Sequence, residues 1–235
     1  MSQWRVKRFW TAASAHPAPG GYEVRLDASS VKTPGKHPLI LPTEALAEAI
    51  AAEWDAQTGQ INPAQMPMTR FANSAIEKVA PQFMAVVGEV ASYGASDLLC
   101  YRATEPPALA DRQAQGWDPI LGWAAQTFAA PLTVTQGVMP VPQPDASLTA
   151  LTAAVAAQTV FRLVALHDLV AISGSLILGL AAARGRLNPA EAFDLSRIDE
   201  HWQAELWGQD GEAIATEARK RADFTAAARF FHYCG

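Results

Sequence analysis

The sequence of 235 residues predicts an α+β fold, with a small strand-rich part at the N-terminus and a larger helical part after it. Three observations predict this fold. Apolar and polar residues alternate within the first forty residues, "NPAQMPM" (62–68) indicates a linker, and apolar residues recur at helical spacing over most of the remaining chain. We therefore expect an N-terminal α/β subdomain with an antiparallel sheet over residues 1–64 and a mainly helical domain over residues 65–235.

The elements of the N-terminal part follow from periodicity and turn residues. Residues 3–10 and "GYEVRLD" (21–27) alternate like half-buried strands, and "HPAPGG" between them indicates a turn. "VKTPG" and "HPLIL" predict two more short strands. Thr43 is suited to cap a helix that ends at Gly59. Trp54 shares helical spacing with Leu46 and Ile50, so we expect it in the core, against the sheet.

The helical part begins after the linker. Residues 69–93 predict a helix that is broken or kinked at Pro81, and residues 108–129 predict a second one. "DLLCYR" (97–102) could be a strand or an extended link, and "LTVT" (132–135) is a short strand candidate. Nearly all of residues 147–234 has helical periodicity, with breaks near 185–189 and 207–211.

Composition excludes several classes of protein. A net charge of −5 and a pI near 5.5 argue against nucleic acid as the main partner, because phosphate binding requires clustered Lys and Arg. Two cysteines form no disulfide framework, and the N-terminus lacks both a signal-peptide core and an import leader, so we expect a cytoplasmic protein. The apolar run at 169–183 is too short for a membrane span, which predicts no membrane insertion.

Motifs for metal, nucleotide or cofactor binding are incomplete in this sequence. Five scattered histidines lack ligand spacing, so no metal site is expected. "GSLILGLA" has the glycine spacing of a phosphate loop, but Leu180 and Ala181 replace the required Lys and Ser/Thr, so no nucleotide is expected. No cofactor is expected either. One alternative remains an enzyme that acts on a small molecule, with a site near Asp97, Arg102, His167 and Asp168.

Cys100 raises a related question. Beside Arg102 it could be a thiolate nucleophile, whereas between leucines it could be a small apolar residue of the core.

The segment 195–207 predicts a helix with two stripes. Leu195, Ile198, Trp202 and Leu206 form the expected core stripe, and Ser196, Glu200, Gln203 and Trp207 form a second one. The second stripe combines an acid, an amide and an indole. It could bind a partner, or it could be a solvated flank of the helix.

Six motifs follow one another along the chain: "KTPGKHPLILP" (32–42), "ALAEAIAAEWDAQ" (45–57), "MPMTRFANSAIEKV" (66–79), "SDLLCYRATEPPALADRQAQGWDPILGWA" (96–124), "SGSLILGLAAARGRL" (173–187) and "IDEHWQAELWGQD" (198–210). In this order they resemble the assembly chaperones of F-type ATP synthase that bind the free alpha subunit of the catalytic head. The resemblance covers about residues 20–215.

This resemblance implies a function without catalysis or catalytic residues. The protein would hold the alpha subunit until the beta subunit replaces it, and Cys100 would be structural. A functionally important glutamate of the family's C-terminal helical motif is matched best by Glu200, with Glu205 and Glu212 as further candidates. Together with Gln203 and Trp207, these are the expected partner-binding residues. The competing classes are the enzyme described above and a membrane-associated helix at 169–183.

Overall fold

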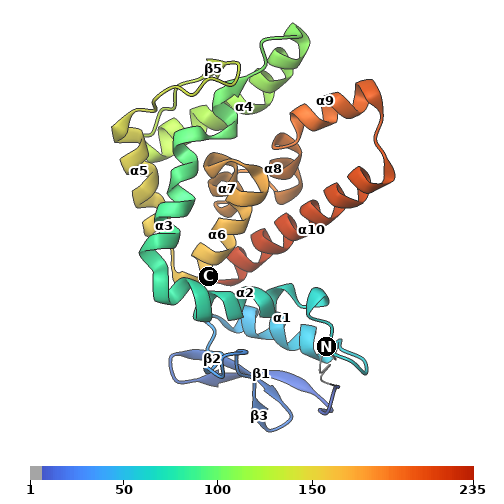
Figure 1. Cartoon of the computed structure of the whole chain (residues 1–235). Coiled ribbons are helices and arrows are strands. Elements are labelled where there is room, and N and C mark those ends of the chain that lie inside the picture. Colours follow the sequence, from blue (N-terminus) through green and yellow to red (C-terminus); the bar gives the residue numbers. More distant parts are fainter. Residues whose placement is uncertain (1–6) are drawn as a thin grey trace. The chain divides into compact units, whose positions relative to one another are not determined.

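The computed structural model describes residues 7–235, which contain ten α-helices and five short strands (Figure 1). The predicted α+β class is confirmed. The chain divides into two units. The first contains residues up to Phe83 together with Thr159–Ala165 and Arg229–Gly235, and the second contains Met84–Gln158 and Leu166–Ala228. The first unit thus extends beyond the boundary predicted at residues 64 and 65. Helices α6 (Val160–Ser173) and α10 (Gly211–Tyr233) contribute residues to both units.

An antiparallel sheet opens the first unit, with strands β1 (Ala13–Ala18), β2 (Gly21–Leu26) and β3 (Ser29–Ser30) in sequence order. β1 and β2 pair from Ala13 opposite Leu26 to Ala18 opposite Gly21. Gly21 has a φ of +153°, and a Cβ atom there would lie 2.2 Å from the carbonyl oxygen of Leu41, so the turn requires glycine.

The strand predictions need correction in three places. The turn predicted at 16–21 is narrower, because residues 16–18 belong to β1. Of the strand predicted at 3–10, residues 3–6 lie outside the described part, and residues 7–10 form only an isolated bridge between Lys7 and Gln60. "VKTPG" and "HPLIL" likewise form isolated bridges rather than strands, through Lys32–Pro38 and Tyr22–Leu41.

Helix α1 (Glu44–Asp55) packs on this sheet. Thr43 caps it as predicted, with its hydroxyl oxygen accepting a hydrogen bond of 3.2 Å from the amide of Leu46. Its apolar face buries Leu46, Ala47, Ile50 and Ala51. Trp54 is only partly buried, so the prediction that it lies in the core is wrong. Its ring packs edge to face against the ring of Trp10, with the two ring centres 5.3 Å apart.

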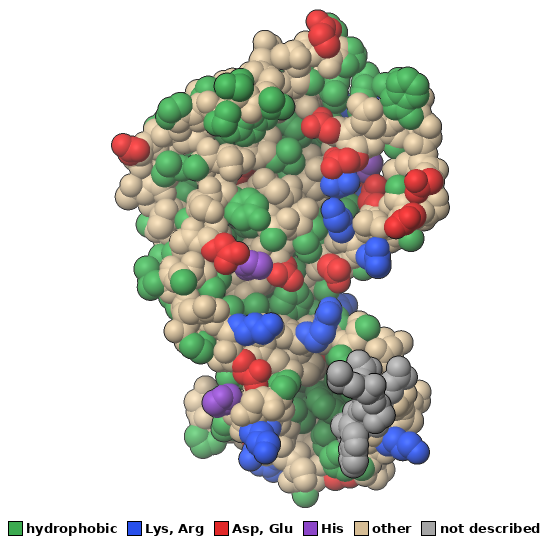
Figure 2. Space-filling model, viewed as in Figure 1, with side chains coloured by type: hydrophobic (Ala, Val, Ile, Leu, Met, Phe, Trp, Pro, Cys, Tyr) green, Lys and Arg blue, Asp and Glu red, His purple; other side chains and the backbone are tan. Residues whose placement is uncertain are grey.

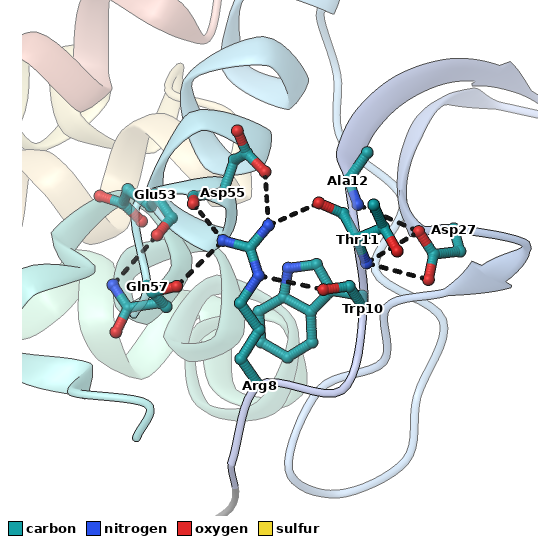
Figure 3. A network of polar contacts seen from close by, with 8 residues as sticks. All are labelled: Arg8, Trp10, Thr11, Ala12, Asp27, Glu53, Asp55 and Gln57. Carbon is teal, nitrogen blue, oxygen red and sulfur yellow. Dashed lines mark hydrogen bonds and ion pairs between the residues drawn. The ribbon is translucent and has the colours of Figure 1, made fainter. Parts of the chain in front are cut away.

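Arg8 closes the C-terminal end of α1 (Figure 3). Its guanidinium donates to the carbonyl oxygens of Asp55 at 2.5 Å and Gln57 at 3.0 Å, and it pairs with the Asp55 carboxylate at 3.0 Å. The last carbonyls of a helix lack partners within the helix, so Arg8 supplies donors where α1 ends.

The predicted kink at Pro81 is confirmed. After η1 (Pro63–Gln65), helix α2 (Pro67–Ser74) continues as a π-helical turn, η2 (Ala75–Val79), and a 3-10 turn, η3 (Ala80–Gln82), into α3 (Phe83–Ser92). Within residues 7–235, the helical stretch Pro67–Cys100 is long and apolar enough to cross a membrane, with a mean hydropathy of 1.2 over its most apolar 18 residues. One such stretch is a weak indication, because core helices of soluble proteins pass the same test.

The second unit is helical around α7 (Leu176–Ala183), all eight residues of which are buried. Helices α4 (Pro107–Phe128) and α8 (Pro189–Leu195) pack against α7. The remaining elements that lie wholly in this unit are η4 (Tyr93–Ser96), η5 (Leu98–Cys100), β4 (Tyr101–Arg102), β5 (Thr135–Gln136), α5 (Asp145–Ala156) and α9 (Ile198–Trp207).

"DLLCYR" therefore forms a 3-10 turn followed by a short strand, and β4 pairs with β5 in parallel. β5 begins at Thr135, so "LTVT" contributes only its last residue to a strand. Cys100 is fully buried, and burial raises the pKa of its thiol to about 12. The core interpretation of Cys100 is confirmed.

Candidate partner-binding groove

The helix predicted at 195–207 is divided in two. Helix α8 ends at Leu195 and α9 begins at Ile198, with Ser196 and Arg197 between them. The indole nitrogen of Trp117 donates to the carbonyl oxygen of Leu195 at 2.8 Å, so a side chain of α4 satisfies this carbonyl where α8 ends. Ser196 is buried and therefore does not lie on the outer flank of α9.

The core stripe of α9 is shorter than predicted. Ile198 is buried and Trp202 is partly buried, but the side chain of Leu206 is 59% exposed. Helical spacing thus wrongly places Leu206 in the core, because Leu206 lies at the C-terminal end of α9, where its side chain stays in solvent.

Polar contacts fix α9 on α4. The guanidinium of Arg112 pairs with both carboxylate oxygens of Glu205, at 2.7 and 2.9 Å, and lies 4.7 Å from the ring centre of Trp202. The Gln113 amide also donates to Asp199 at 2.5 Å. These contacts hold α9 on α4 and leave Glu200, Gln203 and Trp207 to line a groove.

The groove lies between α9 and the N-terminal part of α10, which run in different directions from the turn that joins them (Figure 1). Its volume is about 620 Å³. Glu200, Gln203 and Trp207 all line it, whereas Glu205 and Glu212 do not. Its charged lining consists of Arg197, Asp199, Glu200, Asp210, Glu217 and Lys220. Figure 2 shows acidic and basic side chains gathered over these two helices.

Most charges of the groove have partners within the chain. Glu200, with a side chain 47% exposed, pairs with Arg197 at 2.6 Å. Glu217 accepts a hydrogen bond from His201 at 3.0 Å, and this contact lowers the pKa of the Glu217 carboxyl. Trp207 contrasts with these residues, because its side chain is 82% exposed. The groove therefore combines charges that are mostly paired within the chain with an uncovered indole.

Of the six charged residues that line the groove, sequence reasoning singles out only Glu200; Arg197 and Asp199 lie in the predicted helix but outside its two stripes. Asp210, Glu217 and Lys220 were not singled out, because they follow the turn after α9 or belong to α10. The acidic composition of residues 191–217 was the available signal. It could not indicate which acids face one another across the groove.

The residues of the alternative enzyme site each have local partners. Asp97 is fully buried and accepts hydrogen bonds from the Ser175 hydroxyl and from the amides of Leu99 and Ile177. Arg102 pairs with Asp118 at 2.5 Å and donates to the carbonyl oxygen of Leu99, as expected for a structural arginine.

His167 contacts Asp168 at 3.0 Å and Glu89 at 3.6 Å, and these carboxylates raise the pKa of its imidazole. Among the described residues, no group of three or more His, Cys, Asp or Glu side chains is arranged to hold a metal ion.

Comparison with known proteins decides the family. Residues 7–125 match the model of a family described as the ATP12 chaperone protein, over half of the chain. The chain belongs to the ATP12 chaperone family.

Solved structures extend this match to the whole chain. Atp12 from Paracoccus denitrificans is 53% identical, with a TM-score of 0.96, over 99% of this chain and 100% of that one. A point mutant of the same P. denitrificans protein matches with equal identity and TM-score over 100% of both chains. Atu1473 from Agrobacterium tumefaciens, described as a candidate chaperone, is 38% identical over 97% of this chain and 86% of that one, with a TM-score of 0.94.

Membership in the ATP12 family confirms the resemblance drawn from the sequence motifs. It identifies the chain as an ATP synthase assembly chaperone and points to a role other than catalysis. The family model ends at residue 125, before the groove, but the P. denitrificans structures cover α9 and α10 as well.

Proposed function

We propose that this chaperone binds the unassembled alpha subunit of the F-type ATP synthase catalytic head, in the cytoplasm, and holds it until the beta subunit takes its place. The observation that carries the proposal is the similarity to P. denitrificans Atp12 along the entire chain, added to the family match.

A free alpha subunit exposes the surface that it later buries against beta subunits, and exposed apolar patches of this kind promote aggregation. A chaperone can cover such a surface with an apolar centre and a polar rim. The tip of α9 and the start of α10 expose Leu206, Trp207 and Ile214 next to the charged groove, which supports this part of the chain as the contact surface.

Release requires no nucleotide in this proposal. If beta competes for overlapping surface on alpha, the free energy of alpha–beta assembly drives the exchange. The acidic side chains of α9 and α10 would then set orientation and association rate more than affinity.

Substitution of Glu200 tests the groove as the contact surface. Glu200→Gln keeps the size of the side chain but removes its charge, and we expect alpha binding to weaken by about 1–3 kcal/mol. Its free energy of unfolding should change by less than about 1 kcal/mol, because the side chain is half exposed. Calorimetric titration with isolated alpha and a urea denaturation curve measure the two quantities.

Glu48→Gln is the matched control, because Glu48 is an exposed acid of α1 in the first unit. It should leave alpha binding unchanged. Equal affinities of wild type, Glu200→Gln and Glu48→Gln for alpha would remove Glu200 from the contact surface. A large loss of stability in Glu200→Gln would instead assign it a structural role.

A further inference from the structure

Arginine, an aromatic ring and a carboxylate meet repeatedly in this structure. Arg8 lies over Trp10 and pairs with Asp55, and Arg102 lies over Trp117 and pairs with Asp118. The same combination joins Arg112 to Trp202 and Glu205, and Arg221 to Phe193 and Asp194. The distances from guanidinium carbon to ring centre are 4.6–5.5 Å. The fold thus uses planar guanidinium groups to cover aromatic rings beside acids.

Trp207 presents the ring of this combination beside groove acids, but no arginine of the described residues lies over the ring. Among residues 7–235 it is the tryptophan that contacts neither another ring nor a cation. Glu200 and Trp207 lie two helical turns apart on α9, and both line the groove.

The acids of the groove retain capacity for a further donor. Asp199 uses one oxygen for the Gln113 amide, Glu200 uses one for Arg197, and Asp210 uses one to cap the amide of Ala213. The groove has four acidic against two basic lining residues, so its charge favours a cation.

We propose that the groove between α9 and α10 receives an arginine side chain of the protein partner, with its guanidinium stacked on Trp207 and paired with the groove carboxylates. This inference rests on the proposed function, because the occupant is a segment of the bound subunit. Arginine fits better than lysine: its guanidinium is planar and weakly hydrated, so it stacks on indole and pairs with two carboxylate oxygens at once.

Short peptides test the chemistry of the groove without the alpha subunit. The probes are two blocked tripeptides, one with arginine between two alanines and one with lysine in that position. They are titrated into the full chain while the indole N–H signal of Trp207 is followed by NMR, with Trp207→Phe to assign it. We expect the arginine peptide to shift this signal with an affinity at least about threefold higher than the lysine peptide. Equal shifts, or no shift with either peptide, would overturn the inference.

Affinity for isolated alpha tests the same contact in the complex. Trp207→Ala should weaken binding about tenfold, and Trp207→Phe, which keeps an aromatic face, should stay within about threefold of wild type. Val138→Ala is the matched control, since Val138 is as exposed as Trp207, at 88%, but lies outside the groove and outside the tip formed by α9 and α10. It should stay within about twofold. Wild-type affinity of Trp207→Ala, or equal losses in the Ala and Phe variants, would contradict the stacking.

These measurements separate the two proposals. Suppose that wild type binds alpha, but the peptides show no preference for arginine and Trp207→Ala binds like wild type or like Trp207→Phe. The arginine site is then wrong and the proposed function stands. If the arginine peptide is selected but wild type does not bind alpha, the site stands and the proposed function is wrong.

Discussion

Asp97 joins two short elements of the second unit through one carboxylate. It accepts hydrogen bonds from Leu99 at the start of η5 and from Ile177 and Ser175 at the start of α7. Burial raises its pKa to about 6, although these hydrogen bonds act in the opposite sense. Asp97 therefore holds the N-terminal end of α7 in place, although burial of its charged form lowers the stability of the folded protein.

This burial predicts a pH dependence of stability. Because the pKa of Asp97 is higher in the folded protein than in the unfolded chain, the folded protein binds the proton more tightly. The contribution of Asp97 to stability is full below about pH 4 and is lost as pH rises through about 6. Relative to Asp97→Asn, which does not titrate, wild type should lose on the order of 2–3 kcal/mol of unfolding free energy between pH 4 and 7.

Urea denaturation of both proteins across this pH range measures the difference. If the difference between wild type and Asp97→Asn did not change with pH, the raised pKa would be wrong.

The two thiols should be unreactive in the folded protein. Cys100 and Cys234 are both buried, and burial raises the pKa of each thiol to about 12, so almost no thiolate is present at neutral pH. We expect no labelling by a thiol reagent within minutes in native buffer and two labelled thiols per chain in concentrated urea. Rapid native labelling of Cys100 would revive its interpretation as a nucleophile.

At the scale of elements, Trp54 connects α1 to the segment that precedes β1. Its ring contacts Trp10, which is buried, so a charge placed there would disturb the packing of both. Trp54→Arg should lower the free energy of unfolding by about 3 kcal/mol, and Trp54→Phe, which keeps a ring, by about 1 kcal/mol. Thermal and urea denaturation measure these losses. An Arg variant as stable as wild type would show that the Trp10–Trp54 contact does not hold α1 in place.

Arg112 should govern the local stability of α9. Arg112→Met keeps the aliphatic stem of the side chain but removes both hydrogen bonds to Glu205 and the guanidinium over Trp202. Amide hydrogen exchange in α9 should then accelerate several-fold, while exchange in α7 stays unchanged, because α7 is buried on all sides. Unaltered exchange in α9 would mean that the Arg112 contacts do not hold this helix in place.

Local chemistry accounts for the elements that could be predicted from the sequence. Thr43 caps α1 through its hydroxyl, and Pro81 interrupts the helix because it lacks an amide hydrogen. The break between α8 and α9 could not be predicted in this way. Neither Ser196 nor Arg197 is a strong helix breaker, and the carbonyl of Leu195 is taken by Trp117, which lies 78 residues away in the sequence.

At the scale of the whole molecule, contacts between segments far apart in the sequence determine the unit boundaries and the groove, and composition does not reveal such contacts. The C-terminal residues join the first unit through the rings of Phe71 and Phe230, 5.0 Å apart, and through a hydrogen bond from the Thr43 hydroxyl to the Tyr233 carbonyl oxygen. The predicted boundary at residue 64 assigns all later residues to the second part, so it could not place Arg229–Gly235 in the first unit. The candidate groove has the same origin: helical spacing predicted the face of Glu200, Gln203 and Trp207, but Glu217 and Lys220 reach it only by the turn into α10.

The central claim, selective binding of an unassembled subunit, is tested most directly by a pull-down with the full chain as bait. Isolated alpha, isolated beta and the assembled catalytic head are offered separately, and then beta is added to the preformed complex with alpha. We predict capture of isolated alpha alone and its release when beta is added. Capture of beta or of the assembled head with equal efficiency, or no capture of alpha, would contradict the claim.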